Sequence, residues 1–170
     1  VVLVFRGGSS GLEFTPSDEL FEILPSDGYA WCGSALAAGD FNGDFFDDLA
    51  IGCPEASRLA VASGGSGGGR HGPDLQAEPG FEIVQGESGI PDEVETNDRF
   101  GFALAVGNFN GDQRCGEFGC APLDDLAIGA PGEDGYAGKV LALFGSSWSL
   151  IVSGASWYGD GDVGGTAESG

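Results

Sequence analysis

One short acidic segment has the residue types and spacing of a calcium loop. Residues 40–52 read DFNGDFFDDLAIG. Positions one, three, five and nine of this segment carry oxygen-bearing side chains, those of Asp40, Asn42, Asp44 and Asp48. Ca²⁺ takes six to eight oxygen ligands at about 2.3–2.6 Å, and Phe46 at position seven would add its backbone carbonyl. Gly43 eases the tight turn between the ligands, so the segment predicts a Ca²⁺ site.

The flanking residues place this loop between β-strands. The apolar run Leu49–Ile51 follows the last ligand directly, and Gly52 and Pro54 leave no room for a helix. An EF-hand would need a longer loop, a bidentate Glu at its end and flanking helices, none of which the sequence shows. We therefore expect a β-hairpin with the cation at its tip.

The segment occurs a second time, with an insert. Residues 108–129 read NFNGDQRCGEFGCAPLDDLAIG and begin 68 residues after the first copy (108 − 40 = 68). The predicted ligands of this copy are Asn108, Asn110, Asp112, the carbonyl of Leu123, and Asp125. It offers two carboxylates where the first copy offers three. Because ligand charge tunes Ca²⁺ affinity, we expect the first site to bind more tightly.

The residues around both loops resemble FG-GAP repeats. The first copy reads GSALAAGDFNGDFFDDLAIGCPE and the second FGFALAVGNFNGD…DDLAIGAPGE, with FG at Phe100–Gly101 and GAP at Gly129–Pro131. The first copy departs from the pattern, with Cys32-Gly33 and Gly52-Cys53-Pro54 at these places. The resemblance covers most of the chain. It implies an all-β fold made of four-stranded antiparallel blades, as in integrin-alpha-type β-propellers, and a partial propeller of about two and a half blades.

The repeat predicts four segments. They are residues 1–28, the second half of a preceding blade; 29–90, a blade with a calcium loop; 91–158, a blade with a calcium loop and a Cys-bracketed insert; and 159–170, a lead-in to a further blade. Strands are expected at Val1–Leu12, Leu20–Leu24, Ser34–Ala38, Leu49–Ile51, Leu59–Ala62, Phe81–Val84, Phe102–Val106, Leu126–Ile128, Lys139–Phe144 and Leu150–Ser153. Because propellers close as rings of four to eight blades, we expect a longer chain or several copies that complete one another.

The four cysteines fall into two pairs. Cys115 and Cys120 bracket the insert, whereas Cys32 and Cys53 lie on the two strands that flank the first loop. We expect two disulfides, with free thiols as the alternative. Zinc would require CxxC spacing or Cys with His, and the lone His71 lies in a glycine-rich stretch. Disulfides together with calcium loops indicate a location outside the cytosol.

The charge excludes several classes of partner. The formal net charge is −21, from 27 acidic and 6 basic residues. This balance argues against nucleic acid and against docking on anionic lipid. Two Ca²⁺ ions would bring −21 only to −17, so a solvated acidic surface accounts for part of the excess. The apolar stretch Val1–Phe5 is too short to insert into a bilayer.

The sequence does not indicate an enzyme, since a lone His in a glycine loop builds no credible triad. Asp47 and Asp124 adjoin predicted ligands, but strand-like alternation should turn them away from the cation. The tryptophans, Trp31, Trp148 and Trp157, are expected to pack between blades.

The resemblance implies a calcium-binding extracellular module for adhesion or protein–protein interaction. Its partner would be a protein or matrix ligand, or copies of the chain itself. Two alternatives stay open. One is a structural subunit of an extracellular fibre or surface assembly, and the other is a non-catalytic appendage of a secreted hydrolase.

Overall fold

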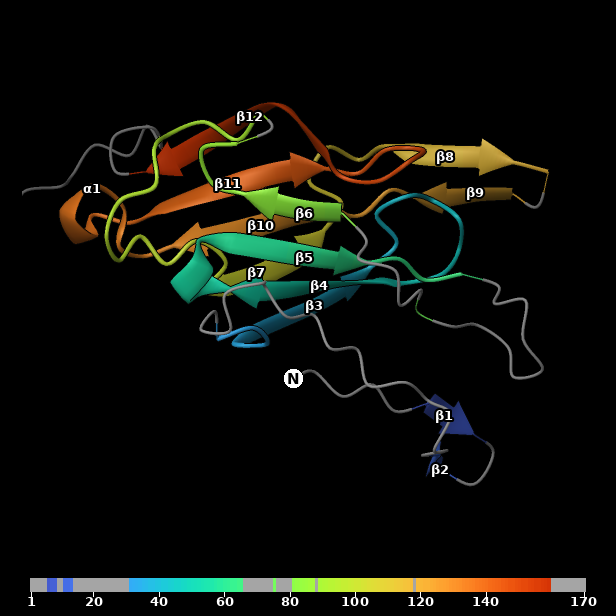
Figure 1. Cartoon of the computed structure of the whole chain (residues 1–170). Helices are drawn as coiled ribbons and strands as arrows, with labels where there is room; N and C mark the ends of the chain where they lie inside the picture. The colour runs from blue at the N-terminus through green and yellow to red at the C-terminus, as the bar shows by residue number, and fades with distance from the viewer. Residues whose placement is uncertain are drawn as a thin grey trace, which may run out of the picture.

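The structure, a computed structural model, describes residues 6–8, 11–13, 31–65, 75, 81–87, 89–117 and 119–159. Its regular elements are mainly β-strands, and every pairing between them is antiparallel (Figure 1). Two four-stranded sheets dominate the fold. The predicted all-β class with four-stranded antiparallel blades is therefore confirmed.

The first blade has the strand order β3-β4-β5-β6. Its strands are β3 (Ala35–Gly39), β4 (Asp48–Cys53), β5 (Arg58–Ala62) and β6 (Phe81–Val84). Each one lies within two residues of its predicted bounds. Strand β4 is covered on both faces, which explains its continuous apolar run in place of alternation.

The second blade repeats this order as β7-β10-β11-β12. Its strands are β7 (Ala103–Gly107), β10 (Asp125–Ala130), β11 (Lys139–Phe144) and β12 (Ile151–Gly159). The predicted end of the last strand at Ser153 is wrong. An irregularity in the pairing with β11, near Gly154 with its φ of +79°, lets the strand continue to Gly159.

The insert of the second loop forms its own hairpin, which was not predicted from the sequence. Strands β8 (Gln113–Gly116) and β9 (Gly119–Pro122) pair with Cys115 opposite Cys120. Figure 1 shows this hairpin extending beyond one end of the sheets, with α1 at the other end.

The remaining elements are short. They are β1 (Arg6–Gly8), which pairs with β2 (Gly11–Glu13), the 3₁₀ turn η1 (Pro54–Ala56) and the helical turn α1 (Glu133–Tyr136). Within the described part of the chain, no helix has the length and apolar character needed to cross a membrane. The predictions for Val1–Phe5, Leu20–Leu24, His71 and residues 160–170 lie outside the described residues.

The two blades pack face to face around one hydrophobic core. Its fully buried side chains come from both sheets and include Leu59, Val61 and Ile83 of the first, and Leu126, Ile128, Leu141 and Leu143 of the second. Trp157 packs edge-to-face on the buried Phe100, with ring centroids 5.8 Å apart. The prediction that all three tryptophans pack between blades is wrong for Trp31 and Trp148, which are exposed.

Candidate metal centre

The last predicted ligand of the first loop, Asp48, is also a structural anchor. It begins β4 and is almost fully buried. Its Oδ2 accepts a hydrogen bond from the N–H of Phe41 at 3.1 Å, and its Oδ1 accepts one from the N–H of Gly64 at 2.8 Å. The carboxylate thereby ties the start of the loop to the residues that follow β5. Each oxygen keeps a second lone pair that a cation could use.

Asp125 repeats this arrangement in the second blade. Its Oδ2 accepts from Phe109 N–H at 2.6 Å, and its Oδ1 accepts from Gly145 N–H at 2.9 Å. The two glycine donors, Gly64 and Gly145, were not predicted from the sequence. The available signal was a glycine that follows the third strand in both repeats. A Cβ at Gly145 would lie 2.5 Å from the carbonyl oxygen of Asp124, so the position requires glycine.

The rest of the first loop closes around the carboxylate of Asp40. Its Oδ1 accepts from the N–H of Asp44 at 3.0 Å, and its Oδ2 accepts from the N–H of Phe45 at 2.8 Å. The carboxylate of Asp44 accepts from Phe46 N–H at 2.9 Å. Gly43 has a φ of +68°, as its predicted role in the turn requires. Phe45 also adopts a left-handed conformation, with a φ of +71°.

The second loop is held by its amides. Asn108 Oδ1 accepts from Gly111 N–H at 2.7 Å, and Asn108 Nδ2 donates to the carbonyl of Asp112 at 2.6 Å. Asn110 Nδ2 donates to Asp112 Oδ2 at 2.9 Å. The buried Leu123 returns the chain to the loop, where its N–H donates to the carbonyl of Asp112 at 3.4 Å. The β8–β9 insert therefore leaves the predicted ligands of this loop together.

Both loops contain a buried oxygen that has no hydrogen-bond partner. These oxygens are Asn42 Oδ1 in the first loop and Asp112 Oδ1 in the second. Both belong to predicted ligands. Leaving a buried acceptor unsatisfied costs about 1–3 kcal/mol. A hard cation at the loop tip would satisfy these oxygens, so the donor sets fit Ca²⁺.

The three carboxylates of the first loop are not gathered on one point. Among the described residues, the group of three acidic side chains that can each bring one oxygen within 4.8 Å of the other two is found elsewhere, at Glu95, Glu133 and Asp134. The carboxylates of Asp40, Asp44 and Asp48 instead accept backbone N–H groups of their own hairpin and of Gly64.

Burial makes negative charge costly at the base of the first loop. It raises the pKa of Asp48 to about 6, and the nearby charges of Asp44 and Asp40 add to this effect. The N–H groups of Gly64 and Phe41 oppose the rise. A bound cation would offset the same cost by favouring the ionised carboxylate.

The two hairpins contact one another directly. Asp124 N–H donates to the carbonyl of Asp40 at 3.0 Å, and Asp124 Oδ2 accepts from Asp40 N–H at 3.0 Å. The Arg114 guanidinium, from the insert, donates to the carbonyl of Asn42 at 3.0 Å. Asp47 is exposed, whereas its counterpart Asp124 is half-buried against the first loop. This contact between the hairpins was not predicted from the sequence.

Both predicted disulfides are present, and all four cysteines are used. Cys32–Cys53 has an S–S distance of 2.04 Å and joins the segment preceding β3 to the end of β4. Cys115–Cys120, at 2.01 Å, closes the β8–β9 hairpin. The alternatives of free thiols and zinc are therefore wrong.

The sequence of this chain is similar to known proteins. Residues 33–70 match the FG-GAP repeat family model. The chain is similar to phosphatidylinositol-glycan-specific phospholipase D of Mus musculus, with 34% identity over 129 residues, 74% of this chain and 14% of that protein. It is also similar to the phosphatidylinositol-glycan-specific phospholipase D of Homo sapiens, with 32% identity over 148 residues, 84% of this chain and 16% of that protein.

The chain thus spans only about a seventh of the length of these relatives. The residues that match the family model include β3, the whole first loop with its predicted ligands, β4 and β5. The expected resemblance is confirmed: this chain carries an FG-GAP repeat, at residues 33–70, in an all-β structure of two four-stranded blades.

Proposed function

We propose that the chain is a calcium-binding, non-catalytic β-propeller module that works outside the cell in protein recognition. The observation that carries the calcium assignment is the pair of buried oxygens without partners, Asn42 Oδ1 and Asp112 Oδ1. They occur in both repeats, and in both they belong to loops with the ligand spacing of a calcium site.

In this proposal, Asp40, Asn42, Asp44, the carbonyl of Phe46 and Asp48 hold the first ion. Asn108, Asn110, Asp112, the carbonyl of Leu123 and Asp125 hold the second. Calcium supplies the positive charge that lets these acidic oxygens share one hairpin tip. The chain's own residues pre-form each tip, because Asp48 and Asp125 already join it to the blade through backbone N–H groups.

The sharpest test compares two neighbouring aspartates of the first hairpin. Asp44→Asn changes a proposed ligand, and Asp47→Asn makes the same chemical change at an exposed residue that is not one. Calorimetric titration should find calcium binding at the first hairpin weakened at least tenfold by Asp44→Asn and unchanged by Asp47→Asn. Equal affinities in the two variants would contradict the assignment.

An extracellular location is supported by the two disulfides, which persist in oxidising compartments. The similarity to phosphatidylinositol-glycan-specific phospholipase D favours a second candidate, a non-catalytic appendage of a secreted hydrolase. In either case residues 1–170 alone should not hydrolyse a phosphatidylinositol-glycan. Hydrolysis by the purified chain, retained after a further purification step, would contradict the non-catalytic role.

The open face of the second blade supports a further blade as one partner. Gly129 pairs with Val140, and Val140 pairs with Tyr158, as Gly52 pairs with Leu59 and Leu59 with Ile83 in the first blade. Leu59 and Ile83 are 0% and 1% exposed because the second blade covers them, whereas Val140 and Tyr158 are 43% and 47% exposed.

The same face contains an apolar cavity of about 490 Å³, lined by Phe102, Gly129, Val140 and Tyr158 among others. In the first blade, the backbone oxygen of Gly101 approaches Gly52 so closely that a Cβ there would lie 2.0 Å from it. Gly129 is the equivalent residue. A third blade could therefore approach the second as the second approaches the first.

A further inference from the structure

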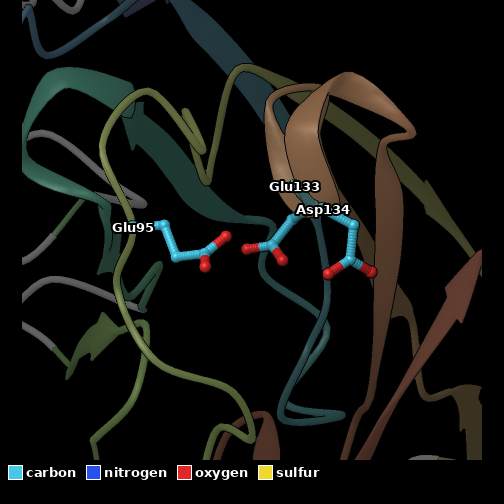
Figure 2. Close-up of side chains that lie close together, drawn as sticks. All are labelled: Glu95, Glu133 and Asp134. Atoms are coloured by element: carbon cyan, nitrogen blue, oxygen red, sulfur yellow. The ribbon is translucent and has the colours of Figure 1, made fainter.

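A separate group of carboxylates lies where the linker between the blades, residues 85–102, meets the second blade. Glu95 comes from the linker, and Glu133 and Asp134 come from α1. One carboxylate oxygen from each of the three lies within 4.8 Å of the other two, and Figure 2 shows the carboxylates of Glu95 and Glu133 facing each other. Oxygens on opposite sides of a Ca²⁺ ion are about 4.6–5.2 Å apart, twice the bond length, so the spacing suits this ion.

The group is distinct from the hairpin loops. Asp125 of the second loop is the first residue of β10, whereas Glu133 follows the last residue of the same strand, Ala130. The two locations are therefore at opposite ends of β10, as the positions of α1 and the β8–β9 hairpin in Figure 1 show.

A buried amide beside the group points independently to a cation. Gln85 is fully buried, and its Nε2 faces acceptors on Glu133, on Asp98 (3.0 Å) and on the carbonyl of Glu93 (3.4 Å). Its Oε1 receives no hydrogen bond. The same is true of Oδ1 of Asp98, whose side chain is 1% exposed. Gln85 Oε1 and Asp98 Oδ1 are thus buried acceptors without a hydrogen-bond donor, and the neighbouring carboxylates and carbonyl cannot supply one.

Among the residues that the structure describes, one cation pairs with this group, the ammonium of Lys139, and it lies on one side only. The ammonium of Lys139 lies 2.7 Å from Asp92 and 2.9 Å from Asp134, and 3.6 Å from the buried Glu133. Among the described residues, no basic side chain pairs with Glu95 or Asp98. Burying a carboxylate without a positive partner costs free energy, and the side of the group away from Lys139 lacks a compensating positive charge.

We propose that this group binds a third Ca²⁺ ion, with the carboxylates of Glu95, Glu133 and Asp134 as ligands. Gln85 and Asp98, which carry the unpartnered oxygens, adjoin this group: Gln85 Nε2 donates to Glu133, and Asp98 Oδ2 accepts from the N–H of Glu95 at 2.5 Å. The ion joins the linker that follows the first blade to the α1 turn of the second. It would therefore set how firmly one blade is held against the next, a role separate from that of the hairpin ions.

The test removes the two exposed ligands, because they can be changed without disturbing the core. The variant is Glu95→Gln with Asp134→Asn, and the control is Glu87→Gln with Glu93→Gln, which removes two exposed charges from the same linker region. Equilibrium dialysis with radioactive calcium should find one ion fewer in the variant than in the control. Calcium should also slow hydrogen exchange of residues 89–98 in the control and not in the variant.

A second experiment, in protein with weakened hairpin sites, distinguishes calcium bound at this group from calcium bound at the hairpins. In protein whose two hairpin sites are weakened by Asp44→Asn and Asp112→Asn, calcium should still bind, and Glu95→Gln with Asp134→Asn should lower the number of bound ions by one. The proposal is overturned if the variant and the control bind the same number of ions with the same affinities. It is also overturned if the folded hairpin-deficient protein binds no calcium.

Discussion

Asp40 and Asp124 pair with one another through both of their backbone N–H groups. Asp124 N–H donates to the carbonyl of Asp40, and Asp40 N–H donates to the carboxylate of Asp124, each at 3.0 Å. The two residues are 84 positions apart and belong to different blades. Asp124, which directly precedes the anchoring residue Asp125, thereby holds the first residue of the first predicted calcium loop.

This pairing predicts that Asp124→Ala weakens the first hairpin. The substitution leaves the N–H of Asp40 without its acceptor, which should cost about 1–2 kcal/mol in the free energy of unfolding. Urea denaturation measures this cost, and calorimetry should show weaker calcium binding at the first hairpin. Asp47→Ala is the matched control, because Asp47 is the exposed counterpart of Asp124. Equal losses in the two variants would show that the pairing contributes nothing.

The left-handed backbone at Phe45 predicts that a glycine at this position gives a more stable protein than an alanine. The φ of Phe45, +71°, lies in the left-handed region, where a side chain costs about 1–3 kcal/mol. Phe45→Gly and Phe45→Ala both remove the ring, but only glycine relieves the backbone. We expect Phe45→Gly to be the more stable of the two by about 1 kcal/mol in urea denaturation. Greater stability of Phe45→Ala would mean that the loop does not hold this conformation.

The close packing at Gly145 predicts that a single added methyl group lowers the free energy of unfolding. A Cβ at this position would lie 2.5 Å from the carbonyl oxygen of Asp124. The backbone must therefore shift, which lengthens the hydrogen bond from Gly145 N–H to the Asp125 carboxylate. We expect Gly145→Ala to lower the free energy of unfolding by about 1–3 kcal/mol. Gly116→Ala is the control, since a Cβ at Gly116 would meet no atom within 4 Å and the φ of this residue is not positive. A loss in the control as large as in Gly145→Ala would reject the steric explanation.

Buried carboxylates predict that the calcium-free protein loses stability as the pH rises. Burial raises the pKa of Asp48 to about 6 and that of Glu133 to about 7, above the ordinary values of 3.8 and 4.5. Between about pH 4 and 7 the folded state therefore binds more protons than the unfolded state, and stability falls with increasing pH. Hydrogen bonding and ion pairing with Lys139 lower the pKa of Asp92, which acts in the opposite direction below about pH 4.

Urea midpoints in chelator should accordingly be lower at pH 7.5 than at pH 5. In Asp48→Asn the urea midpoint should change less with pH below about pH 6 than in the unmodified protein, because the amide does not titrate. Glu82→Gln, at an exposed residue, should leave the pH dependence of the urea midpoint unchanged. A midpoint in chelator that rises from pH 5 to pH 7.5 would contradict the raised pKa values.

The open face of the second blade predicts that a charged residue at Val140 lowers the melting temperature. If a further blade covers this face in the native protein, Val140→Asp places a carboxylate in an apolar interface and should lower the melting temperature by several degrees. Trp148→Asp is the control, because Trp148 is 89% exposed and does not line the cavity. Similar melting temperatures for the two variants would argue against a covering blade.

The strands of each blade could be predicted from the sequence, because they depend on residues close together in the chain, whereas the calcium ligands stay predictions. The apolar runs that follow the two loops mark β4 and β10. The disulfide partners follow from the same hairpins. The segment boundaries at residues 28, 90 and 158 stay predictions.

Only the tertiary structure decided which distant groups meet. The packing of one blade on the other brings Asp124 to Asp40, and Gln85 to Glu133. The return of the third strand brings Gly64 and Gly145 to the anchoring aspartates. No spacing in the chain encodes these contacts, because they depend on how two twisted sheets fit face to face. The group formed by Glu95, Glu133 and Asp134 exists for the same reason.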